Sequence, residues 1–176
     1  MHISQEYPMF DAAPIPEYNV GIADIPQVAA RTGLEQMQAI LSGDFPAPSM
    51  AQTMTQWIER VAEGEAEFRG EPSAAVLNPM GIVHGGWAMT LLDSALGCAV
   101  HTTMAKGEMY VSLDTSVRFI RAITAETGQV RCIGRVQSRG RRIATAEAVI
   151  EDQKGRILAS GTSSCFIQPM SPDAGS

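Results

Sequence analysis

The sequence predicts an α+β protein in which one antiparallel sheet wraps around a long central helix. Residues 85–105 are apolar on almost every side, which is typical of a buried helix. Before them, residues 62–70 alternate between apolar and polar side chains, the period of a strand with one wet face. After them come four strand-like segments separated by turn sequences, which indicates an antiparallel meander.

The chain before the first strand is less regular. Residues 1–30 are rich in proline and have no sustained period, so we expect an irregular arm. Residues 33–43 have apolar side chains at helical spacing and end in Gly43, which predicts a short helix. The same spacing predicts a second amphipathic helix over residues 50–61.

The second half of the chain supplies most of the sheet. Strands are expected over residues 110–122, 128–138, 141–152 and 155–168. Because 176 residues suffice for one sizeable core, we expect a single domain over residues 56–168. An arm with short helices precedes it over residues 1–55, and a flexible tail follows over residues 169–176.

Composition narrows the class of protein. The three cysteines are widely spaced and form no C-x-x-C pair, so they indicate neither a disulfide framework nor a zinc site. No window is long and apolar enough for a membrane span, and the N-terminus lacks the pattern of an export signal. We therefore expect a cytoplasmic protein with no membrane partner, no metal and no bound cofactor.

The charge is unevenly distributed along the chain. The net charge of −6 argues against binding to nucleic acid. Residues 1–71 hold eleven acidic side chains and three arginines, whereas residues 118–142 hold seven arginines and one glutamate. Such a basic zone on an acidic protein favours a small polyanionic ligand over a DNA backbone, although solvent-facing strand arginines would give the same pattern.

The stretch "NPMGIVHGGWAMTLLDSALG", residues 78–97, places a carboxylate inside the apolar helix. Asp93 is flanked by leucines and alanines, and burying it there would cost several kcal/mol, about 2–7 for a polar group, unless it is paired. Such a group is usually functional, and Gly97 one turn later would leave space for a ligand beside it. Alternatively, Asp93 accepts structural hydrogen bonds within a dimer interface.

The residues before the helix suggest a site for a developing negative charge. Gly85 and Gly86 open the helix, where backbone N–H groups and the helix dipole favour an anion. Asn78 can add an amide donor or hold a water molecule. His84 is expected to fix the turn by a hydrogen bond, because no metal-ligand set surrounds it.

The combined pattern resembles a known family. "NPMGIVHGG" with Asp93 eight residues after Gly85, together with "VSLDTSVRF" and "DQKGRILASGTSS", resembles the hotdog-fold acyl-CoA thioesterases of the phenylacetate-degradation type. The resemblance covers about residues 60–168. It implies a hotdog fold, hydrolysis of an acyl-CoA thioester, and Asp93 as nucleophile or general base. It also implies a homodimer or a dimer of dimers.

Two further expectations concern the strand after the helix and the arrangement of the site. Ser112 and Asp114 should share one face of that strand, and the resemblance implies that Ser112 helps the acid to place water. Gly85 and Asp93 are eight residues apart, or about 12 Å along a helix, too far to act on one carbonyl carbon. We therefore expect the active site to lie between two subunits.

The basic segment is the expected binding site for the phosphates of coenzyme A. Its turn, "SRGRRIA", offers Gly140 for backbone approach and three arginines for bidentate contacts. The candidates are Arg139, Arg141 and Arg142, with Arg121 as an additional contact. The resemblance implies that this family holds the nucleotide end here.

Other chemistries find less support. The sequence contains no G-x-S-x-G, H-E-x-x-H, P-loop or G-x-G-x-x-G motif. Two alternatives stay open: a hydratase or dehydratase of the same fold, which would need His84 as base, and a non-catalytic module that binds acyl-CoA.

Overall fold

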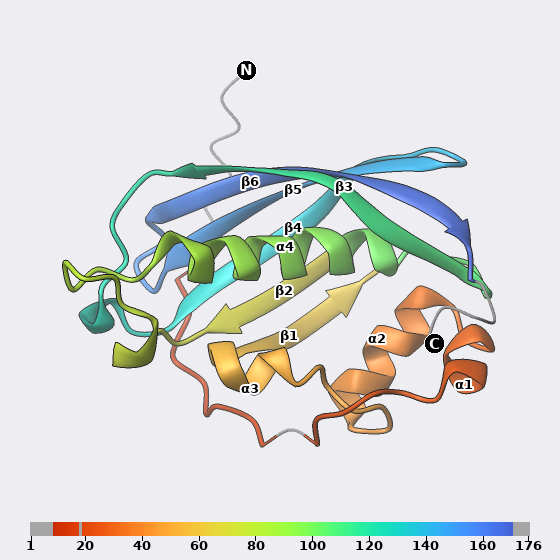
Figure 1. Cartoon of the computed structure of the whole chain (residues 1–176), viewed down its shortest axis with the longest axis horizontal. Helices are drawn as coiled ribbons and strands as arrows, with labels where there is room; N and C mark the ends of the chain where they lie inside the picture. Colours follow the sequence, from red (N-terminus) through yellow and green to blue (C-terminus); the bar gives the residue numbers. More distant parts are fainter. Residues whose placement is uncertain (1–8, 18, 171–176) are drawn as a thin grey trace.

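An antiparallel sheet encloses a long central helix, as expected from the sequence, but the sheet has six strands, one more than expected (Figure 1). The structure, a computed structural model, describes residues 9–17 and 19–170. The strands are β1 (Gln56–Ala62), β2 (Glu65–Gly70), β3 (Glu108–Phe119), β4 (Val130–Arg139), β5 (Ile143–Asp152) and β6 (Ile157–Pro169). Their order in the sheet is β1-β2-β4-β5-β6-β3, so β3 is an edge strand. The expected tail beyond residue 170 lies outside the described residues.

The central helix α4 (Gly85–His101) packs against the concave face of the sheet. Leu91, Leu92, Ala95 and Leu96 are fully buried there. The opposite face is open, because the sheet covers only part of the helix circumference: Met89 is 43% exposed and Asp93 is also exposed. The expectation that this helix is buried all round is therefore wrong for a single chain.

The segment expected as a second helix changes its structure half-way. Helix α3 (Met50–Met54) ends at Thr55, whose backbone is left-handed with φ 50°. Strand β1 begins at the next residue, and Trp57 and Ile58, which favour strands, are buried in it. A hairpin with Gly64 at φ 76° then leads into β2. Strand β1 was not predicted, because its residues also fit the spacing of a helix.

Helices α2 and α3 lie beside β1, and α2 also contacts α4 (Figure 1). Helix α2 (Gly33–Ser42) is confirmed, and Thr32 and Glu35 form a capping box at its start. The backbone N–H of Gly33 donates to Met104 O at 2.9 Å, next to the end of α4. The single-turn helix α1 (Ile25–Ala29) was not expected, because it lies within the proline-rich arm.

The arm itself crosses the outer face of the sheet. The ring of Phe10 lies under the guanidinium groups of Arg69 and Arg131, at 4.2 and 4.9 Å from its centroid. The side-chain amide of Gln129 bonds both the N–H and the carbonyl of Ala13. Beneath the arm, Arg131 forms a buried ion pair with Glu151, so part of the basic segment is neutralised within the fold.

Candidate active site

The start of α4 presents one unused backbone donor. The Nδ1 atom of His84 accepts a hydrogen bond of 2.9 Å from the N–H of Gly86, so His84 is the N-cap and fixes the turn. The N–H of Gly86 is therefore engaged, contrary to its expected role as a second donor to the substrate. For the N–H of Gly85, no acceptor is found in the part of the chain that the structure describes. Gly85 borders a groove of about 340 Å³ that Phe119 and Arg121 also line.

Asn78 holds the loop that leads into the helix. Its Oδ1 atom accepts hydrogen bonds from the N–H groups of Met80 and Ile82, at 2.9 and 3.1 Å. Its own N–H donates to Ile82 O at 2.7 Å. The side-chain oxygen is thus occupied, and the Nδ2 group has no partner among the described residues. Asn78 therefore combines a structural acceptor with a donor that a ligand could use.

Asp93 lies on the open face of α4 and is oriented by β3. The hydroxyl of Thr115 donates to Asp93 Oδ1 at 3.1 Å. The space expected beside Gly97 is filled, because the hydroxyl of Tyr110 occupies the position that a Cβ would take. Burial and the nearby Cys98, Cys165 and Asp93 raise the pKa of Tyr110 well above its ordinary value, so its hydroxyl stays protonated.

A β-bulge in β3 decides which side chains face Asp93. Ser112 pairs with Cys165 of β6, but Asp114 pairs with the next residue, Ser164, so Leu113 is left without a partner. The extra residue reverses the alternation of side chains between the two faces of the strand. Ser112 and Asp114 are therefore on opposite faces, and the expectation that they share one is wrong.

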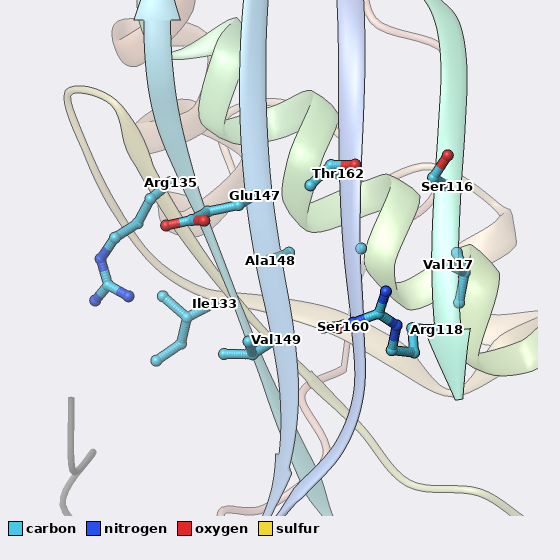
Figure 2. A pocket seen from close by; sticks show the side chains of 11 residues that line it. Ser116, Val117, Arg118, Ile133, Arg135, Glu147, Ala148, Val149, Ser160 and Thr162 are labelled. Atoms are coloured by element: carbon cyan, nitrogen blue, oxygen red, sulfur yellow. The ribbon is translucent and has the colours of Figure 1, made fainter. Parts of the chain in front are cut away.

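Thr115 takes the place expected for Asp114. It faces the helix, whereas Asp114 shares the outer face of the sheet with Ser116 and Arg118. Figure 2 shows Ser116 and Arg118 on that face, among the residues that line a groove of about 330 Å³. No sequence signal marks this bulge, so Thr115 could not have been identified from an alternating pattern.

The candidate phosphate-binding arginines fall into two groups. Arg121 lies near the start of α4 and donates to the carbonyl of Ile157. The other three lie at the turn between β4 and β5, where Arg139 forms an ion pair of 2.9 Å with Glu108, and Gly140 N–H bonds Ile143 O at 2.8 Å. The side chains that line a groove of about 580 Å³ there include Arg141, Arg142 and Phe166.

Exposed apolar side chains occur in the loop before α4, on the open face of α4, and along and just after β3. Their exposed fractions are 83% for Met80, 43% for Met89, 59% for Leu113, 56% for Phe119 and 45% for Ile120. The 12-residue edge strand β3 runs beside them. An open strand edge with an apolar surface next to it is typical of a protein interface.

Comparisons with known proteins agree with this architecture. Residues 80–159 match the family model described as the thioesterase superfamily. A phenylacetic acid degradation-related protein of Ralstonia eutropha JMP134 is 28% identical, with a TM-score of 0.68 over 74% of this chain and 98% of that one. No curated protein matches the sequence.

Two more distant structures share the fold. A thioesterase of Haemophilus influenzae is 18% identical, with a TM-score of 0.67 over 80% of this chain and 94% of that one. A Streptococcus mutans protein solved with acetyl CoA is 22% identical, with a TM-score of 0.60 over 65% of this chain and 90% of that one. The described helices include none that is long and apolar enough to span a membrane.

Proposed function

Because residues 80–159 match the model of the thioesterase superfamily, we propose that this protein hydrolyses an acyl-CoA thioester to the free acid and coenzyme A. The observation that supports this most is Asp93, an exposed carboxylate oriented by Thr115 on a helix that starts with the unused N–H of Gly85. A thioesterase needs this pair: a carboxylate to activate or deliver the attacking oxygen, and a donor for the carbonyl oxygen.

The chemistry follows from these two groups. Asp93 accepts a proton from water as the water oxygen bonds to the carbonyl carbon, or its own oxygen attacks first and water then cleaves the anhydride. The negative charge on the carbonyl oxygen is stabilised by the N–H of Gly85 and the amide of Asn78. In the water route, the C–S bond of this intermediate then breaks, and the proton held by Asp93 passes to the thiolate of coenzyme A. In the covalent route, the C–S bond breaks as the anhydride forms, the thiolate leaves, and the proton of the water that later cleaves the anhydride balances its charge.

The two groups act on one carbonyl only if they come from different subunits. Within one chain they are separated by about 12 Å along α4. We propose that a second copy pairs along the exposed edge of β3 and covers Met89, Leu113 and Phe119. A closed two-fold dimer would bring the start of each helix to Asp93 of the other and would form two equal sites.

The coenzyme A moiety would extend toward the arginines. The turn between β4 and β5 lies beside Glu108, just beyond the end of α4 at His101. Arg141 and Arg142 are our candidates for the phosphates, because Arg139 is already paired with Glu108. The Streptococcus mutans relative, solved with acetyl CoA, supports a ligand of this class.

The geometry makes a hydratase less suitable. Such a reaction would need a histidine as base near the acid, but Nδ1 of His84 already accepts from Gly86 and holds the helix start. A non-catalytic acyl-CoA-binding module would not need a carboxylate oriented toward the ligand.

Release of free thiol from acyl-CoA esters tests the proposal. Asp93→Asn should retain the fold and lower kcat by about 10²–10⁴, because it removes the base or nucleophile. The matched control is Asp114→Asn, which changes an exposed carboxylate on the outer face of the neighbouring strand and should retain activity. Turnover by Asp93→Asn at the wild-type rate would remove this residue from the mechanism. A wild-type protein that binds the esters without releasing thiol would favour the binding module.

A further inference from the structure

A small apolar cavity lies between α4 and the N-terminal helices. Its volume is about 120 Å³. The side chains that line it include Met37 and Ile40 from α2, Ala51 from α3, Ile58 from β1, and Ser94 and Cys98 from α4. Helices α2 and α3 are outside residues 80–159, so this wall does not come from the segment that matches the family.

The wall is fixed to the domain at the end of α4. Gln36 donates from Nε2 to the carbonyls of Val28 and Arg31, so its Oε1 must be the acceptor for Nε2–H of His101, at 2.8 Å. Gly33 lies so close to His101 that a Cβ there would overlap the carbonyl oxygen of His101. Helix α2 is therefore part of the folded domain and gives the cavity a defined shape.

The cavity is lined by residues of the same part of α4 that carries the candidate catalytic carboxylate. Ser94 follows Asp93 directly, and Cys98 lies five residues after Asp93, about 7 Å along the helix. Burial, with a contribution from the Asp93 carboxylate, raises the pKa of the Cys98 thiol to about 12. Cys98 thus stays neutral, and it forms an uncharged wall close to Asp93.

The volume of the cavity favours a slim ligand over an aromatic ring. An apolar cavity of about 150 Å³ in another protein holds a benzene molecule, and this one is smaller. An aliphatic chain is slimmer than an aromatic ring and can fill such a space one methylene at a time.

We infer that this cavity receives the acyl group of the thioester, and that it suits a short aliphatic chain. The inference rests on the proposed thioesterase function and gives the N-terminal helices a role in substrate selection. In this arrangement, residues of α4 and the loop before it carry out the reaction, and residues of α2, α3 and β1 determine which acyl groups are accepted.

Measuring thiol release from unbranched acyl-CoA esters of four to ten carbons tests this inference. We expect kcat/KM to rise about fourfold per methylene until the cavity is full, and then to level off. Ile40→Ala should shift the preferred length upward by one or two carbons, and Ala51→Leu should shift it downward. The matched control is Leu41→Ala, because Leu41 is the neighbouring residue on α2 and does not line the cavity.

The outcomes separate this inference from the proposed function. Thiol release with a length profile that neither Ile40→Ala nor Ala51→Leu shifts would overturn the cavity assignment and leave the thioesterase in place. A preference for benzoyl or phenylacetyl esters over every aliphatic ester would also overturn it. No thiol release from any ester would overturn both.

Discussion

If Asn78 of one subunit and Asp93 of the other form one site, two inactive variants should restore activity when they share a dimer. The perturbation that the structure suggests for the first subunit is Asn78→Asp. A carboxylate can still accept from the N–H groups of Met80 and Ile82 and hold the loop, but it has no amide donor for the substrate. The second subunit carries Asp93→Asn.

The expected recovery follows from counting sites. Random refolding of an equal mixture makes about half of the dimers mixed, given a closed two-fold dimer. Each mixed dimer has one site with both native residues and one site with neither, so it should have half of the wild-type activity. The mixture should therefore reach roughly a quarter of wild-type activity, whereas the parents should retain about 1% or less.

The assay is thiol release after denaturation, mixing and refolding, with an affinity tag on one variant. Dimers that keep the tag and contain both chains can be isolated and measured directly. Refolded wild-type protein controls for losses during the procedure. If isolated mixed dimers are as inactive as their parents, each site is built within one chain, and the inference from the 12 Å separation is refuted.

Two further predictions concern the junction of α2 with α4. Gly33→Ala should destabilise the protein by about 1–3 kcal/mol and lower the Tm by several degrees, because its Cβ would overlap the His101 carbonyl. Gly21→Ala, where a Cβ would lie 3.6 Å from Pro46, should have little effect in the same thermal unfolding assay. Burial lowers the pKa of His101 below its ordinary value of 6.5. As the pH falls below 6.5, His101 therefore binds a proton in the unfolded chain before it does so in the folded protein, and the free energy of unfolding decreases. Between pH 7.5 and 5.5, the wild-type protein should lose up to about 1.4 kcal/mol more unfolding free energy than His101→Gln; equal losses would contradict this.

Much of the fold could be predicted from the sequence, because its strands and its central helix have strong and different periods. The alternation over residues 62–70 predicted a strand that is now β2, and the apolar run predicted α4. The prediction of a helix over residues 50–61 was wrong beyond Met54, and the reason is physical. Helical spacing continues through Trp57 and Ile58, but the left-handed Thr55 ends the helix, and pairing with β2 outweighs local preference.

The candidate site was predictable where function depends on local sequence. The role of His84 in the helix start follows from residues two positions apart, and the position of Asp93 on the helix follows from spacing alone. Thr115 could not be predicted, since its orientation depends on the unpaired Leu113. The cavity could not be predicted either, because it joins residues from α2, α3, β1 and α4 that are far apart in the chain.

The unpaired Leu113 also affects how this protein should be aligned with its relatives. In an unbulged strand, the second residue after Ser112 would face the helix, and that residue here is Asp114. A gapless alignment with a relative that has no bulge would equate Asp114 with the neighbour of the candidate catalytic carboxylate, and would compare an outward carboxylate with an inward side chain. Placing a one-residue gap at position 113 instead equates Thr115 with that neighbour, so comparison of this strand with an unbulged one depends on the treatment of a single residue.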